Sequence, residues 1–265
     1  SYCRSLAAEE FFDDDDGFSS YLLSVGAVPN KYPRLMPFLA GEILRGRKVI
    51  IFPEGGMVKD RRVHDRKGHY RIYSRTARER RKHHTGAAVL SLKVDLLKQS
   101  IRNDFERNDD RSIDNWLNIL ELDGREALQA AVERKSTIVP ANITFYPMRV
   151  GDNLLRRGVE LFNKGISKRL SEELLIEGNI LLKHTDMDIR LGDLIYTEEH
   201  WKYWERQITR RCSNCIRTLD DLLVPNPSKS SVERRYLSAR IRRNSLKLRD
   251  SYMRGIYVEV TINLS

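Results

Sequence analysis

Cysteine and long apolar runs are scarce in this chain of 265 residues, and each scarcity excludes a class of protein. The 3 cysteines are too few for the disulfide framework of a small secreted domain, and they favour a reducing compartment. No apolar stretch approaches the roughly 20 residues that a membrane-spanning helix needs. Residues 1–10 also lack the basic and apolar segments of a signal peptide. We therefore predict a chain with no transmembrane segment and enough residues to bury a core.

Metal-binding patterns are also incomplete. Cys212 and Cys215 have the spacing of half a zinc site, but no second cysteine or histidine pair lies near them in the sequence. The acidic run 13–16 fails as a calcium loop, because placing Gly17 sixth puts Phe12 in the first ligand position. We predict no metal site and interpret the cysteine pair as structural.

Basic residues outnumber acidic ones, 47 to 37, so the formal net charge is +10. Such an excess attracts nucleic acid or an anionic membrane surface, or simply keeps a surface solvated. The basic runs 78–84 and 234–249 carry no recognised nucleic-acid motif and have acidic neighbours such as Glu79. We therefore predict no nucleic-acid partner and favour attraction to anionic lipid headgroups.

Short apolar runs alternate with helical patterns, which predicts an α/β fold with a mixed sheet flanked by helices. Residues 48–52 are largely apolar and β-branched, and a Pro-Glu-Gly-Gly turn stops them, which predicts a buried central strand. The run 136–146 predicts a second strand in the same sheet, although it contains Pro140, which removes a ladder donor. Two further strands are predicted at 187–191, where apolar and polar residues alternate, and at 255–264.

The helical patterns extend over much of the remaining chain, and the C-terminal region is basic and largely helical. The charged stretch 59–84 is predicted to be a solvated loop, and the polar stretch 102–111 a surface insertion. We divide the chain into residues 1–150 and a helical continuation, residues 151–265. The predicted helices lie at 33–47, 85–99, 113–122, 125–134, 153–163, 171–182 and over most of 197–252.

The turn after the first predicted strand holds the candidate binding residues. Glu54 follows a buried strand and precedes Gly55 and Gly56, so its carboxylate is rigidly presented and open to close approach by a ligand. Three cations a few residues downstream could complete an anion site: Lys59, Arg61 and Arg62.

Four segments, in order, resemble a known family. The tetrapeptide 52–55, Phe-Pro-Glu-Gly, resembles the third motif of the glycerol-phosphate and lysophosphatidate acyltransferases. Residues 138–144, an apolar strand with an internal proline, resemble the fourth motif, and residues 85–88 resemble the glycine-led helix after the third. Residues 26–31 look like a degenerate second motif, in which Lys31 stands where the family has arginine. The resemblance runs from the second motif to the fourth, with an enlarged region between the third and fourth.

The resemblance implies transfer of a fatty acyl group from acyl-CoA or acyl carrier protein to a hydroxyl of glycerol phosphate or lysophosphatidate, in phospholipid synthesis. In this family a histidine acts as general base on the acceptor hydroxyl, the oxygen attacks the thioester, and no metal or redox cofactor takes part. The implied location is peripheral, on the cytoplasmic face of a membrane, with the acyl donor, the acceptor and the anionic membrane surface as partners. The substrate-binding residues carried over are Glu54, Gly55, Gly56, Lys31, Lys59, Arg61, Arg62 and Pro140.

Two departures from the family pattern change what this chain can do. The arginine that often follows the third motif's glycine is replaced here by Gly56 or Met57. The first motif, a histidine with an aspartate five positions later, is absent, so no catalytic residue is predicted within this chain. The positions five after the histidines hold His69, Ser74, Ala88, Val89, Ile189 and Glu205.

Two hypotheses follow from the missing histidine motif. In the family this motif precedes the second, so a transferase domain that is incomplete at its N-terminus would have its base upstream of Ser1, a residue that is not Met. The alternative is a non-catalytic lipid-surface or interaction module on an acyltransferase scaffold. A His-x4-Asp motif encoded in frame upstream supports the first hypothesis, and a start codon near Ser1 supports the second.

The 265-residue chain is predicted to transfer no acyl group by itself. It lacks the general base, whose contribution is typically ~10²–10⁴-fold. Thioester release from acyl-CoA, measured with glycerol 3-phosphate or lysophosphatidate as acceptor, should therefore stay at background. Robust turnover would show that a different residue acts as the base.

Overall fold

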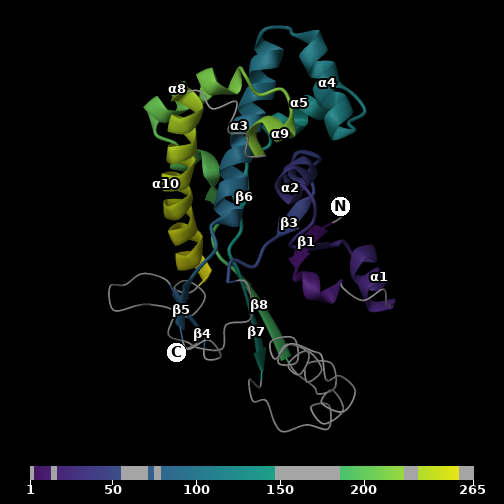
Figure 1. Cartoon of the computed structure of the whole chain (residues 1–265), viewed down its shortest axis with the longest axis vertical. Helices are drawn as coiled ribbons and strands as arrows, with labels where there is room; N and C mark the ends of the chain where they lie inside the picture. Colours follow the sequence, from purple (N-terminus) through teal and green to yellow (C-terminus); the bar gives the residue numbers. More distant parts are fainter. Residues whose placement is uncertain are drawn as a thin grey trace. The chain divides into compact units, whose positions relative to one another are not determined.

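The structure is a computed structural model that describes residues 3–12, 17–54, 71–74, 79–146, 186–223 and 232–256 (Figure 1). Helices and small parallel and antiparallel sheets build a broadly α/β fold. The chain divides into two compact units. The first unit is Ser1–Ile138 with Leu194–Met253, and the second is Val139–Asp193 with Arg254–Ser265. The division at residue 150 stays a prediction.

A three-stranded parallel sheet opens the first unit, with its strands in the order β2-β1-β3. The chain leaves β1 for β2 on one side and then returns across β1 to β3 on the other side. Helices make both connections, as parallel strands require. In chain order the elements are β1 (Cys3–Ala7), η1 (Glu9–Phe11), α1 (Gly17–Ser24), β2 (Ala27–Pro29), α2 (Leu35–Leu44) and β3 (Lys48–Ile50).

β3 was predicted to be a buried central strand, and this prediction is wrong, because β3 lies at an edge of the sheet that the described strands form, and Lys48 and Ile50 are exposed. Successive side chains of a strand point to opposite faces. Val49 and Ile51 pack against the hydrophobic core, whereas Ile50 and Phe52 are 45% and 50% exposed. Both faces of the run are apolar in sequence, but among the described residues only one of them meets the core.

The approach of β2 to β1 depends on Gly26. Its φ of 92° lies in the left-handed region, which favours glycine. A Cβ atom at this position would lie 2.5 Å from the carbonyl oxygen of Cys3. The same glycine accepts a hydrogen bond at 3.2 Å from the backbone N–H of Ser5. The glycine of the degenerate second motif therefore has a structural role at the start of β2.

A buried carboxylate joins the sheet to α2. Glu42 is 1% exposed, and its oxygens accept hydrogen bonds from Arg4 at 2.6 Å and from Arg47 at 2.6 and 2.7 Å. Arg45 adds a bond of 3.1 Å and also donates to the carbonyl of Leu120 at 2.8 Å. Burial opposes ionisation of Glu42, but the hydrogen bonds from Arg47 and Arg4 outweigh it and lower the pKa. One carboxylate thus ties β1, α2 and the start of β3 together.

The rest of the first unit is largely helical, and α3 (Gly86–Glu106) lies at its centre, in contact with helices on several sides (Figure 1). Buried leucines such as Leu90 and Leu97 join side chains of α2, α4, α5 and α9 in one hydrophobic core. Among the described residues no helix has the length and apolar character that crossing a membrane requires. The other helices are α4 (Asp110–Leu120), α5 (Arg125–Glu133), η2 (Thr197–His200), α8 (Tyr203–Ser213), α9 (Leu219–Leu223) and α10 (Val232–Arg254).

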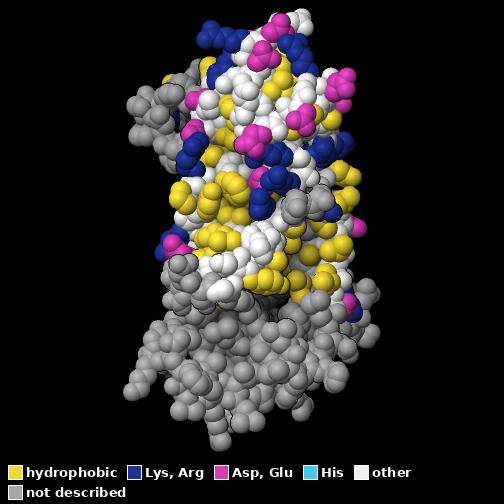
Figure 2. Space-filling model, turned by 90° about the vertical axis from the view of Figure 1, so that its right-hand side faces the viewer, with side chains coloured by type: hydrophobic (Ala, Val, Ile, Leu, Met, Phe, Trp, Pro, Cys, Tyr) yellow, Lys and Arg dark blue, Asp and Glu magenta, His cyan; other side chains and the backbone are white. Residues whose placement is uncertain are grey.

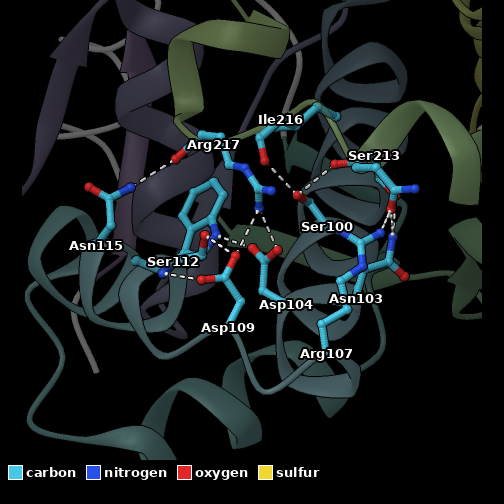
Figure 3. A network of polar contacts seen from close by, with 12 residues as sticks. Ser100, Asn103, Asp104, Arg107, Asp109, Ser112, Asn115, Ser213, Ile216 and Arg217 are labelled. Atoms are coloured by element: carbon cyan, nitrogen blue, oxygen red, sulfur yellow. Dashed lines mark hydrogen bonds and ion pairs between the residues drawn. The ribbon is translucent and has the colours of Figure 1, made fainter.

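α3 extends into the stretch 102–111, which was wrongly predicted to be a surface insertion. Asn103 and Asp104 are 3% and 1% exposed. Asp104 accepts hydrogen bonds from the indole N–H of Trp116 at 3.0 Å and from Arg217 at 2.5 Å (Figure 3). Because both carboxylate oxygens are bonded, the helix can continue through the core instead of leaving it.

The remaining described strands form antiparallel pairs. The charged stretch predicted as a loop contains β4 (Arg71–Ser74) and β5 (Glu79–Lys82), which pair with each other. β6 (Thr137–Ile138) pairs with β9 (Ile195–Tyr196), and in the second unit β7 (Ala141–Tyr146) pairs with β8 (Asp186–Leu191). The strand predicted at 187–191 is therefore confirmed. The prediction that 48–52 and 136–146 share one sheet is wrong.

Pro140 explains why the run 136–146 forms two strands, β6 and β7, instead of one. It has no N–H for a ladder, so a strand pairing cannot run through it unbroken. Its carbonyl accepts a hydrogen bond at 2.8 Å from the N–H of Gly192, at the point where β7 begins. The helices predicted at 153–163 and 171–182, and residues 257–264 of the predicted last strand, lie outside the described residues.

Replacing Glu42 by glutamine should lower the free energy of unfolding by about 3 kcal/mol or more, because the arginines around it lose their buried counter-charge. Denaturant unfolding measures the change. Glu106→Gln is the matched control, since Glu106 is 53% exposed and pairs with Arg210 at 2.5 Å. That exposed pair should contribute at most about 1 kcal/mol. Equal losses in the two variants would contradict the central role of Glu42.

Candidate functional site

The carboxyl edge of the parallel sheet carries two of the predicted binding residues. In open α/β sheets, ligands bind outside the carboxyl ends of the strands, where neighbouring connections leave in opposite directions. In the order β2-β1-β3, the connection after β1 leads to one side of the sheet and the connection after β2 returns across β1 to the other side. Glu9 follows β1, Lys31 follows β2 and Glu54 follows β3, so the chain presents charged side chains after each strand.

An exposed ion pair joins two of these connections. Lys31 Nζ contacts the carboxylate of Glu9, and the two side chains are 77% and 34% exposed. The N–H of Asn30 donates to the carbonyl of Ala7 at 2.9 Å and holds the end of β2 against the end of β1. The ammonium of Lys31 is therefore on the surface, while the Oε2 atom of Glu9 that it contacts is buried.

The turn at Pro53 and Glu54 is held by residues that are distant in sequence. The N–H of His84 donates to the carbonyl of Pro53 at 2.8 Å, and the hydroxyl of Tyr252 on α10 donates to the carbonyl of His84 at 3.0 Å. Tyr252 is only 2% exposed. Burial raises the pKa of this phenol, and the negative charge of nearby Glu54 adds to the rise. The hydroxyl therefore stays protonated and remains a donor.

Several predicted site residues cannot be placed at this edge. Pro140 belongs to the second unit, so its predicted role beside Glu54 stays a prediction. Five others lie outside the described residues: Gly55, Gly56, Lys59, Arg61 and Arg62.

Three residues at the edge were missed by sequence reasoning, each for a different reason. Glu9 follows β1, a short strand of mixed polarity that has no clear apolar run. His84 takes part through its backbone groups, which leave no signal in the side-chain pattern. Tyr252 lies 168 positions from His84, and only the packing of α10 brings the two together.

The described histidines do not reproduce the missing catalytic motif. His83 is 3% exposed, and Nε2 of His200 in η2 lies 3.4 Å from the hydroxyl of Ser251. Within the part of the chain that the structure describes, no group of three or more His, Cys, Asp or Glu side chains could hold a metal ion. Among the described residues, no histidine with an aspartate five positions later accompanies Glu54 at this edge.

A second titratable cluster lies on α3. Burial raises the pKa of Asp95 to about 6 and lowers the pKa of Lys98 to about 8. Asp95 is hydrogen bonded to Ser136 and Trp201, while Lys98 Nζ donates to the carbonyl of Arg134 at 2.5 Å and to Ser136 Oγ at 3.0 Å. These bonds connect α3 to the chain before β6 and after η2, so we interpret the cluster as a structural tie.

An open polar groove lies between α3 and α8, and two of its three arginines, Arg107 and Arg210, are engaged in holding α3 against α8 and the residue after it. Arg210 pairs with Glu106 at 2.5 Å, and Arg107 donates to the side-chain oxygen of Asn214. The groove is therefore a weaker candidate for a ligand site than the sheet edge. Its lining residues are Asn103, Glu106, Arg107, Gln207, Arg210, Arg211 and Asn214.

No protein family model, no curated protein and no solved structure matches this chain. The interpretation of function therefore depends on the sequence motifs and on the geometry of the sheet edge.

Asp95 should make the stability of the protein fall as the pH rises from about 4 to about 6. Its pKa of about 6 in the folded state exceeds the ordinary 3.8, so the folded state binds more protons than the unfolded state in this window. Asp95→Asn cannot ionise. The free energy of unfolding of the wild type, measured relative to this variant, should therefore drop by about 2–3 kcal/mol across the window. A difference that does not change with pH, in denaturant unfolding, would contradict the raised pKa.

Proposed function

We propose that this chain is the acceptor-binding part of a glycerolipid acyltransferase, with a sheet and helices arranged as in that family. The observation that carries the proposal is the place of Glu54. It lies beyond the carboxyl end of β3, a strand of a parallel sheet, within the tetrapeptide 52–55 that resembles the family's third motif. Ligands of open α/β sheets bind outside the carboxyl ends of the strands, so this position supports a bound ligand.

The charged groups at the edge suit glycerol phosphate or lysophosphatidate. The carboxylate of Glu54 can accept hydrogen bonds from glycerol hydroxyls. The ammonium of Lys31 can pair with the phosphate after leaving Glu9. Three more cations follow Glu54 closely in the sequence and would add to the phosphate site: Lys59, Arg61 and Arg62.

Because this chain lacks the histidine motif, we propose that it performs only part of the reaction. The residues of this chain bind and orient the acceptor, while the general base comes from a histidine motif upstream. Acyl-CoA or acyl carrier protein supplies the thioester, and the acceptor oxygen displaces the thiol to form the ester. We propose no metal or redox cofactor for this reaction.

A peripheral position on the cytoplasmic face of a membrane fits the proposal, because lysophosphatidate and the acylated products reside in the membrane. The net charge of +10 favours contact with anionic headgroups. Figure 2 shows hydrophobic side chains gathered on one face of the described residues, with Lys and Arg side chains among them. Exposed apolar residues of the first unit include Tyr21, Leu23, Val25, Tyr32 and Phe52.

The same exposed apolar residues also favour a second candidate, a non-catalytic lipid-surface or interaction module on the same scaffold. Surface attraction requires no specific role for Glu54, whereas acceptor binding does. A change at Glu54 therefore separates the two candidates.

Glu54→Gln should weaken binding of glycerol 3-phosphate by roughly 10- to 100-fold, because a charge-assisted hydrogen bond contributes about 1.5–3 kcal/mol. Isothermal titration calorimetry measures the affinity. The melting temperature should change little, since Glu54 lies in a turn outside the hydrophobic core. Glu133→Gln, at an exposed glutamate on α5, is the matched control and should bind like the wild type.

Extension of the chain upstream to include a histidine motif gives the matching kinetic test. There Glu54→Gln should remove most of the turnover while the control variant keeps it. Binding to vesicles of anionic lipid that is equal in both variants, together with no affinity for glycerol 3-phosphate in the wild type, would instead support the interaction module.

A further inference from the structure

The Pro53–Glu54 turn is held in place by two hydrogen bonds in series. His84 lies just before α3, and its N–H donates to the carbonyl of Pro53 at 2.8 Å. The carbonyl of His84 accepts a hydrogen bond from the hydroxyl of Tyr252 at 3.0 Å. The backbone of His84 therefore links the turn after β3 to a side chain of α10.

Tyr252 is a fixed part of α10 and has little freedom to move. It is 2% exposed, and its neighbours Leu248 and Met253 on the helix are fully buried. A buried hydroxyl without a partner costs ~1–3 kcal/mol, so the bond to His84 favours one orientation of the ring and one position of the acceptor. Asn244 of the same helix donates to Glu205 of α8 at 3.1 Å and anchors α10 to α8.

Glu54 lies close enough to this hydroxyl for its charge to act on it. Burial raises the pKa of Tyr252, and the carboxylates of Glu54 and Asp250 raise it further, against the opposing charge of Arg249. The phenol is therefore a permanent donor at neutral pH. The hydroxyl of Tyr252 can donate its hydrogen to the carbonyl of His84 whether the neighbouring carboxylates are ionised or protonated.

From this geometry, and resting on the proposed role of Glu54, we propose that Tyr252 is a positioning residue of the acceptor site. Its hydroxyl holds the backbone of His84, which holds the carbonyl of Pro53 and so orients the carboxylate of Glu54 toward a phosphate-bearing glycerol acceptor. α10 thereby contributes a residue to a site whose recognisable motif, at Glu54, lies 198 positions earlier in the sequence.

Tyr252→Phe tests the proposal because it removes only the hydroxyl and keeps the buried ring. Amide hydrogen exchange at His84 should become about tenfold faster, since its bond to Pro53 is no longer held. The affinity for glycerol 3-phosphate should fall roughly 3- to 10-fold, the range expected for one hydrogen bond. Tyr203→Phe is the control, because Tyr203 is 78% exposed on α8 and should change neither quantity.

A double-mutant cycle with Glu54→Gln separates positioning from general stability. If Tyr252 acts through Glu54, the two changes are not additive in affinity, and Tyr252→Phe has little further effect once Glu54 is glutamine. Additive losses would overturn the proposal, and so would a lowered melting temperature with unchanged affinity.

The exchange measurement also keeps this proposal distinct from the proposed function. A wild type that does not bind glycerol 3-phosphate refutes acceptor binding and with it the orientation of Glu54 toward that ligand. Exchange at His84 that is the same in the wild type and in Tyr252→Phe refutes the positioning of the turn, whatever the affinities are.

Discussion

The burial of α3 is the constraint on which the rest of the first unit depends. A helix surrounded by other helices must find partners for every polar side chain it carries inward, since each unpaired buried group costs ~1–3 kcal/mol. The hydroxyl of Ser100 lies 2.9 and 2.7 Å from the carbonyls of Ser213 and Ile216 (Figure 3). Asn103 donates to the carbonyl of Arg210 at 3.2 Å. The carbonyls of Arg210 and Ser213 belong to the last turn of α8, where the helix has no N–H four residues further on to donate to them. The polar side chains of α3 thus find their partners at the carboxyl end of α8 and in the turn after it.

The packing of α3 also determines the geometry of the candidate site. α3 begins at Gly86, so the packing of α3 also places His84 two residues earlier, beside the carbonyl of Pro53. α10 supplies Tyr252 from the other direction. On the sheet side, Glu42 fixes the strands whose carboxyl ends bear the charged residues. The candidate site, on a sheet with three described strands, is thus held by helices as well as by strands.

Local patterns predicted a large part of the fold. The helices α2, α4 and α5 lie where apolar periodicity indicated them, because each buries one face and so repeats its apolar residues at a fixed interval. The strand β8 also lies where it was predicted, although Ile189 and Leu191 are 52% and 68% exposed. The pattern failed where burial depends on a partner. Asn103 and Asp104 are polar and were assigned to the surface, yet Trp116 and Arg217 make their burial favourable. Turn chemistry and the resemblance to the family's third motif singled out Glu54 as a candidate ligand residue, and in the structure Glu54 follows β3.

The sequence by itself determined the local elements and the Pro-Glu-Gly turn, because apolar spacing, proline and glycine act over a few residues of backbone. Only the tertiary structure decided that β3 is an edge strand, since its exposure depends on which elements cover each face. The tertiary structure also decided that Tyr252 reaches the backbone of His84 across 168 positions. A single hydrogen bond between such distant residues has no period and no composition that a sequence can display. It exists only because packed helices bring its donor and acceptor within 3.0 Å.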